Sequence, residues 1–215
     1  MDWRRLGGLA GMAGALLFVT VFMVEGFLRP GYDPVSMFVS ELSRGPRGGI
    51  QIASFVVSGA LLLLFARGVA AELKAGRASR AGPILLAIIS ISLLVSGPLV
   101  MDPAATPREL MTLNSRLHWA FGALVFSLAP VSCWVFWFRF RRDPDWQGFQ
   151  GWTLLAAMAT TVAVVLFSAG PTRPPAAPND FNAYTGLIQR SLLVPYLIWI
   201  FAFAWRLRRR AGRAA

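Results

Sequence analysis

The stretch GPILLAIISISLLVSGPLVM, residues 82–101, contains no charged side chain and is as long as a helix that crosses a bilayer. Such a helix needs about 20 apolar residues, because each residue advances the chain by about 1.5 Å through a hydrocarbon core of roughly 30 Å. Five more runs are similarly long and mostly apolar. In chain order, the six runs are 6–28, 50–71, 82–101, 116–138, 150–169 and 187–205. We therefore expect an all-α polytopic membrane protein, a six-transmembrane-helix bundle that forms a single domain over 1–215.

The composition supports a membrane class. The 215 residues are 56% hydrophobic and 14% charged, whereas soluble domains have about 25% charged residues. The net charge of +11 suggests an anionic partner. Because the basic residues flank the apolar runs, that partner is expected to be membrane lipid and not nucleic acid. Cys133 and His118 are the only residues of their types, which excludes paired-cysteine and multi-histidine metal sites within one chain. No metal and no cofactor are expected.

Basic residues cluster on alternate connections between the runs. The N-terminus and the segments 72–81, 139–149 and 206–215 are rich in arginine, whereas 29–49, 102–115 and 170–186 carry more balanced charges. Basic loops stay in the cytoplasm. This predicts an N-in/C-in topology with 206–215 as a basic cytoplasmic tail. Anionic lipid headgroups are the expected partners of the basic segments.

Several ionisable and polar residues lie near the predicted outer ends of the runs. Such residues are costly at membrane depth and therefore mark candidate sites. They are Glu25, Asp102, Arg116, His118, Gln189 and Arg190, together with Asp33, Ser40 and Glu41 of the first outer loop. One interpretation is structural, with Glu25 and Asp102 neutralising Arg116 and Arg190. The other is a polar pocket that opens outward.

The favoured function is non-catalytic: a pocket for a lipid or small apolar molecule, or a module for a membrane-protein partner or a second copy of the chain. The alternative is a lipid-modifying enzyme of isomerase, cyclase or hydrolase type, with Asp102, His118 and Glu25 as acid–base groups. Whether the chain is an enzyme stays open, because no P-loop, G-x-S-x-G or H-E-x-x-H motif is present. A transporter is a weaker alternative, since no paired broken helices are evident.

The first outer loop has its own pattern. Pro30-Gly-Tyr-Asp-Pro34 is typical of consecutive turns. The next residues, Val35 to Leu42, predict a short amphipathic helix whose apolar face is Val35, Phe38, Val39 and Leu42, with Ser40 and Glu41 toward the bundle mouth or water. We expect this loop to lie among the lipid headgroups. The alternative is a lid over an outer cavity.

The first outer loop contains two distinctive segments, Gly31-Tyr-Asp-Pro34 and Ser40-Glu-Leu-Ser43, and the second segment leads into a glycine-rich start of the second run. Three further features lie later in the chain: Asp102-Pro103, His118 and the segment from Gly186 to Arg190. The chain thereby resembles the bacterial and archaeal membrane family catalogued as domain of unknown function 998. That resemblance implies a compact six-helix bundle in a bacterial or archaeal cell (inner) membrane, and no established reaction. A distant likeness to eukaryotic multispan proteins of the Frag1 and DRAM type rests on the first-loop phrase alone.

Overall fold

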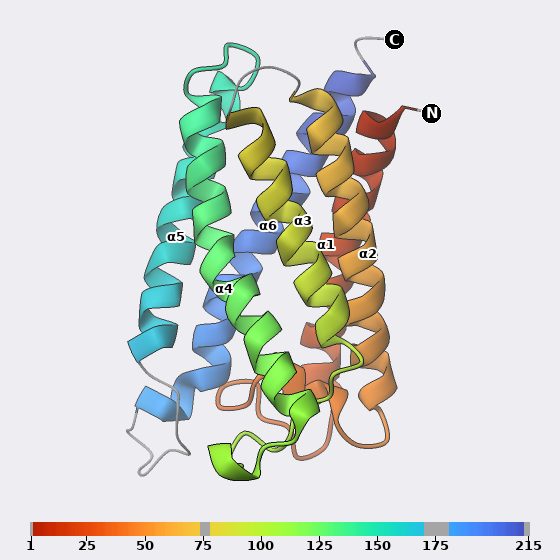
Figure 1. The fold of residues 1–215 in the computed structure, drawn as a ribbon, viewed down its shortest axis with the longest axis vertical. Coiled ribbons are helices and arrows are strands. Elements are labelled where there is room, and N and C mark those ends of the chain that lie inside the picture. Colours follow the sequence, from red (N-terminus) through yellow and green to blue (C-terminus); the bar gives the residue numbers. More distant parts are fainter. Residues whose placement is uncertain (1, 74–77, 170–180, 213–215) are drawn as a thin grey trace.

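The computed structural model describes residues 2–73, 78–169 and 181–212. Within them the chain forms helices and no strand, so the expected all-α fold is confirmed. The long helices are α1 (Trp3–Leu28), α2 (Gly48–Glu72), α3 (Ala78–Ser96), α4 (Leu113–Phe140), α5 (Gln150–Ala169) and α6 (Thr185–Ala211) (Figure 1). Short 3-10 helices are η1 (Val39–Ser43), η2 (Arg108–Leu110), η3 (Gln147–Phe149) and η4 (Phe181–Tyr184).

The helices are long and apolar enough for a polytopic membrane bundle. Among the described residues, five helices meet the length and hydropathy of a membrane span, and Arg80–Ser96 of α3 is a shorter apolar helix. The sixth span therefore stays a prediction. The third run was expected to reach residue 101, but α3 ends at Ser96. Pro98 disfavours helical geometry at Gly97 and cannot donate a backbone hydrogen bond, so the helix stops before this pair.

Each helix packs against its neighbours in sequence, and α6 returns to pack against α1. Small residues allow the closest approach. A Cβ atom added to Gly7 of α1 would lie 2.7 Å from the Cα atom of Gly68 of α2, so the two backbones touch at these glycines. Such small-residue contacts drive helix association in lipid, where apolar side chains gain nothing by leaving the hydrocarbon.

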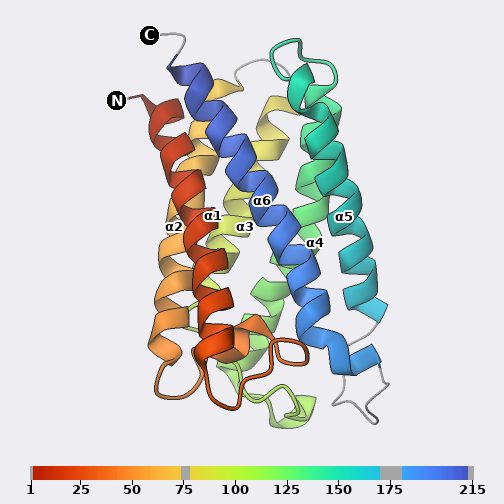
Figure 2. The ribbon, with the colours of Figure 1, turned by 180° about the vertical axis from the view of Figure 1, so that it is seen from behind.

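The two ends of the bundle differ in charge. Both termini lie at one end, together with the end of α2, the start of α3 and the α4–α5 connection (Figures 1 and 2). The described arginines of this terminal end are Arg4, Arg5, Arg67, Arg80, Arg139, Arg141, Arg142, Arg206, Arg208, Arg209 and Arg210. The basic segments that the sequence predicts on one side of the membrane therefore lie at one end of the bundle. The N-in/C-in orientation itself stays a prediction.

The expected basic tail, 206–215, begins as a continuation of the last helix, and its cytoplasmic location stays a prediction. Helix α6 continues to Ala211, and residues 213–215 lie outside the described part of the chain. Arg210 explains the continuation: its Nε donates to the Glu72 carboxylate at 2.8 Å, and its Nη2 lies 2.9 Å from the carboxylate of Asp145. These contacts hold the last turns of α6 against α2 and the α4–α5 connection.

Candidate functional site

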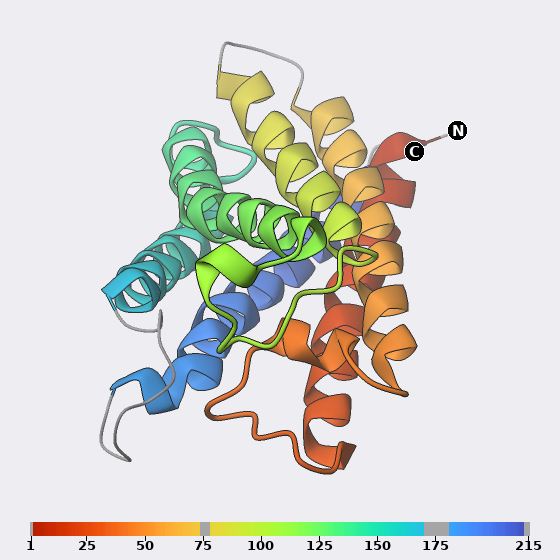
Figure 3. The same cartoon turned by 60° about the horizontal axis from the view of Figure 1, so that its bottom comes forward.

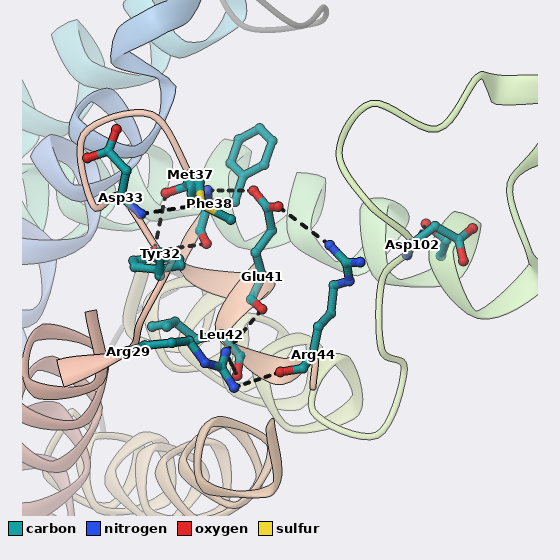
Figure 4. Close-up of polar contacts among 10 residues, drawn as sticks. Arg29, Tyr32, Asp33, Met37, Phe38, Glu41, Leu42, Arg44 and Asp102 are labelled. Atoms are coloured by element: carbon teal, nitrogen blue, oxygen red, sulfur yellow. Dashed lines mark hydrogen bonds and ion pairs between the residues drawn. The ribbon is translucent and has the colours of Figure 1, made fainter. Parts of the chain in front are cut away.

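The loop between α1 and α2, residues 29–47, is folded onto the opposite end of the bundle (Figure 3). We call it the first loop. The Arg29 guanidinium donates hydrogen bonds to the carbonyls of Leu42 at 2.7 Å and Arg44 at 2.6 Å, which curls the loop around one side chain (Figure 4). Phe38, Val39 and Leu42 are buried against the protein. These apolar side chains are therefore packed against protein, and the position of the loop among lipid headgroups stays a prediction.

The amphipathic helix expected from Val35 to Leu42 does not form; only Val39–Ser43 is helical, as η1. Asp33 accounts for the difference. Its carboxylate accepts hydrogen bonds from the backbone of Val35 at 3.0 Å and Ser36 at 3.2 Å, and from the Ser36 hydroxyl at 2.5 Å. An aspartate that bonds the backbone ahead of it favours a turn over a helix. The Ser36 hydroxyl and these backbone groups hold the pKa of Asp33 below its usual value.

Arg190 of α6 fastens the first loop to the bundle. Its Nη1 donates to the carbonyl of Pro34 at 2.8 Å, and its Nη2 donates to the Tyr32 hydroxyl at 2.6 Å. That hydroxyl in turn donates to the Phe38 carbonyl at 3.0 Å. The loop comes so close to α6 that a Cβ on Gly186 would lie 2.3 Å from the carbonyl oxygen of Met37, so only glycine fits there.

Two acceptor groups complete the loop's hydrogen bonding. The Gln189 Oε1 atom of α6 accepts from the backbone N–H of Val39 at 2.7 Å. Glu41 accepts from the Phe38 N–H at 3.0 Å through Oε1, and its Oε2 lies 3.8 Å from Arg44. Burial raises the pKa of the Glu41 carboxyl above its ordinary value, because removing a carboxylate from water disfavours its charge.

The expected ion pairs of the outer end are wrong. Glu25 pairs with Arg47, at 2.5 Å from Nη2 and 3.1 Å from Nε, and not with Arg116 or Arg190. Asp102 accepts from the backbone N–H of Thr112 at 2.7 Å and from its hydroxyl at 3.1 Å. It therefore supports the start of α4, whereas the sequence suggested the end of α3. Arg116 is exposed.

A cavity of about 470 Å³ lies between the first loop and the helices, a volume within the range of about 300–1,000 Å³ typical of small-molecule sites. All six long helices contribute to it, and most of its wall is apolar. Its aromatic residues are Phe18, Phe38, Phe55, Trp119, Phe126 and Phe167. Its polar residues are Ser40, Ser96, Arg108, His118, Ser127, Ser168 and Gln189.

The contacts of His118 define its role in the cavity wall. Nδ1 lies 2.8 Å from the carbonyl oxygen of Leu99 and 3.1 Å from that of Ser96. Carbonyls only accept, so we assign the ring proton to Nδ1; in a neutral ring Nε2 is then a hydrogen-bond acceptor. Among the described residues, no group bonds to Nε2. His118 thus offers one oriented acceptor to a molecule in the cavity.

The same wall also carries a hydrogen-bond donor. Gln189 uses Oε1 for the first loop, and no described residue accepts from its amide NH2 group. The ring of Trp119 packs edge-on against Phe38 with centroids 5.5 Å apart, while its Nε1 atom is enclosed by protein and has no partner among the described residues. The free amide donor of Gln189 suits a ligand that carries an acceptor.

Of the predicted site residues, Ser40, His118 and Gln189 line the cavity. Asp33, Glu41 and Arg190 instead shape the first loop, and Glu25, Asp102 and Arg116 lie outside the lining. The three proposed acid–base groups are therefore not assembled around this cavity. In the described part of the chain, no group of three or more His, Cys, Asp or Glu side chains is placed to hold a metal ion.

Sequence reasoning missed Arg108, Trp119 and Gly122 as cavity residues. A tryptophan near the end of an apolar run, such as Trp119, is typical of the interfacial aromatic belt, and an arginine in a connection, such as Arg108, is typical of a solvated loop charge. Helical spacing was the available signal, because His118 and Gly122 are four residues apart and Trp119 and Phe126 are seven apart, which places each pair on one face of α4. No comparable signal exists for Arg108, which lies on η2 in the α3–α4 connection.

Comparisons with known proteins add the family. Neither the curated proteins nor the solved structures give a significant match to this chain. A family model described as "Protein of unknown function (DUF998)" matches residues 12–206, which includes most of every long helix, the first loop and the cavity. The chain therefore belongs to the DUF998 family of proteins of unknown function.

Proposed function

We propose that this integral membrane protein binds an amphiphile, a lipid or small apolar molecule with one polar end, in the cavity beneath the first loop. The observation that carries the proposal is the distribution of polarity along the cavity. Ser40 and Arg108 belong to the connections, and Ser96 is the last residue of α3. His118 and Gln189 lie on the second turns of α4 and α6. The polar wall is thus close to the loop end.

The deeper wall is mostly apolar. Phe18 lies ten residues before the end of α1, a distance of about 15 Å at 1.5 Å per residue. Leu193 and Val125 lie eight and twelve residues into α6 and α4, and Ser127 is the polar exception among the deep residues. An elongated molecule satisfies this arrangement when its polar end is at the loops and its apolar part points into the bundle.

The first loop supports this proposal as the cover of the cavity. Phe38, Val39 and Ser40 line it, while the backbone of Val39 is held by Gln189, which lines the same space. The loop and the cavity therefore share residues. The shared residues support the lid, the alternative that the sequence left open, and under this proposal the order of the loop and ligand binding depend on one another.

Tryptophan fluorescence tests the proposal. A fatty acid brominated at the end of its chain quenches an indole only at short range, so titration in an uncharged detergent should give a saturable loss of Trp119 fluorescence. The saturable part should be absent from Trp119→Phe and present in Trp152→Phe, because Trp152 is 63% exposed on α5 and does not line the cavity. Absence of saturation in the unmodified protein, or its persistence in Trp119→Phe, would contradict binding in this cavity.

A further inference from the structure

Resting on that proposed function, we infer that the ligand is a single-chain amphiphile with an anionic head, such as a long-chain carboxylate, and that Arg108 binds the head at the cavity mouth. The cavity volume of about 470 Å³ lies in the lower half of the range of about 300–1,000 Å³ for small-molecule sites, which favours one apolar chain over two. The sign of the head charge follows from the charged side chains around the mouth.

Arg108 is the one charged side chain among the described residues that line the cavity. It is exposed on η2, and no described carboxylate forms an ion pair with it. Two acidic residues at this end are engaged elsewhere: Glu25 with Arg47, and Glu41 with the Phe38 backbone and Arg44. Glu109, the neighbour of Arg108 on η2, is exposed and is not part of the cavity wall. Among the described residues, the wall therefore carries one positive charge and no carboxylate.

Asp102, on the same connection as Arg108, does not change this balance. Its two carboxylate oxygens accept from the backbone and hydroxyl of Thr112, and it is not part of the cavity wall. Figure 4 shows it on a connection separate from the Glu41–Arg44 contact. Because the Asp102 carboxylate bonds to Thr112 at the start of α4, the guanidinium of Arg108 is available for a bidentate contact with an anionic group.

An uncharged donor points to the same ligand class. The Gln189 amide NH2 group has no acceptor among the described residues, and Gln189 belongs to the cavity wall near the loop end. An anionic oxygen accepts from several donors at once, and hydrogen bonds to a charged acceptor are stronger than neutral ones. Arg108 thus supplies the charge, and the Gln189 amide orients the head.

Displacement of the brominated probe tests this inference. The competitors are dodecanoate, the alcohol with the same chain, and acetate, which has the charge without the chain. Dodecanoate should displace the probe at a concentration about tenfold lower than the alcohol, the ratio expected for one charge-assisted contact. Acetate should not compete, because it fills none of the apolar wall.

Arg108→Gln should weaken dodecanoate about tenfold and leave the alcohol unchanged. Arg116→Gln is the matched control: Arg116 is exposed near the same end of α4 but is not a cavity residue, so it reports any effect of overall surface charge. Its dodecanoate affinity should equal that of the unmodified protein.

The outcomes separate the two proposals. If acid and alcohol compete equally and Arg108→Gln affects neither, the anionic head is refuted while the cavity remains a binding site. If Arg116→Gln weakens dodecanoate as much as Arg108→Gln does, the effect belongs to surface charge and the assignment to Arg108 fails. Competition by acetate would show a simple anion site. If no long-chain competitor displaces a saturable probe signal, the proposed function fails as well.

Discussion

Gly122 offers a direct way to close the cavity without disturbing the fold. It lies on α4 in the cavity wall, and a Cβ atom built on it would meet nothing within 4 Å. A leucine at this position can therefore extend into the space that we assign to the apolar chain of the ligand. Leucine also has a higher helix propensity than glycine, by up to about 1 kcal/mol, so Gly122→Leu should fold at least as well as the unmodified protein.

The expected loss of affinity follows from the displaced chain. A leucine side chain has four carbon atoms, and burial of each methylene contributes about 0.8 kcal/mol. Displacing an equal length of apolar chain therefore costs about 3 kcal/mol, which corresponds to a weakening of the dissociation constant of about a hundredfold.

Mass spectrometry of lipids that co-purify with gently extracted protein, together with the fluorescence titration, measures this effect. Gly151→Leu is the matched control, because a Cβ on Gly151 of α5 also meets nothing within 4 Å but the residue is exposed and outside the cavity wall. The control should retain the bound molecule. A Gly122→Leu protein that unfolds at an unchanged temperature and still binds with unchanged affinity would refute the reasoning.

Three other predictions concern the first loop and the topology. Arg190→Gln removes the guanidinium that bonds Pro34, Met37, Gly186 and Tyr32, so it should destabilise the fold by about 2–4 kcal/mol and speed amide hydrogen exchange in the first loop; unchanged exchange would contradict the fastening role. The pKa of Glu41 is raised in the fold. The free energy of unfolding should therefore fall as pH rises from the ordinary glutamate value of 4.5 through the raised pKa, because the folded state holds the proton to a higher pH than the unfolded state does. Glu41→Gln keeps an acceptor for the Phe38 N–H and should remove that decline; a decline of the same size in the variant would show that another group causes it. For the topology, Glu109→Cys should react with an impermeant thiol reagent on intact cells and Arg142→Cys only after permeabilisation, with buried Cys133 as a silent background; the reverse pattern would invert the N-in/C-in assignment.

The sequence predicted the long helices because bilayer thickness and backbone hydrogen bonding impose a local rule. A run of about 20 apolar residues has few alternatives to a helix when the backbone must satisfy itself in lipid. The errors occur at the ends. At Gly97-Pro98 the backbone chemistry overrides the apolar pattern, and this stop signal is present in the sequence itself. At the end of α6 the extension depends on Glu72 and Asp145, which are remote in sequence and could not be predicted from it.

The partners of the charged side chains show the limit of sequence reasoning most clearly. Charge complementarity predicts that buried arginines pair with carboxylates, yet the guanidinium of Arg190 donates to loop carbonyls and a tyrosine hydroxyl, and Glu25 pairs with Arg47. A scarce polar residue can be recognised as unusual from its position in an apolar run. Which group it meets is decided by the distance between segments after packing, and that distance is not encoded in spacing along the chain.

By itself, then, the sequence determined an all-α bundle of apolar helices with arginines gathered at one end, because hydropathy and helix length act locally. Only the tertiary structure decided that the first loop folds back onto α6 and that His118, Gln189 and Arg108 share one cavity. Their convergence depends on side-chain packing and on hydrogen bonds across more than a hundred residues of chain, such as that between Val39 and Gln189. No pattern within a single segment specifies such contacts, since each is fixed by the relative placement of several helices.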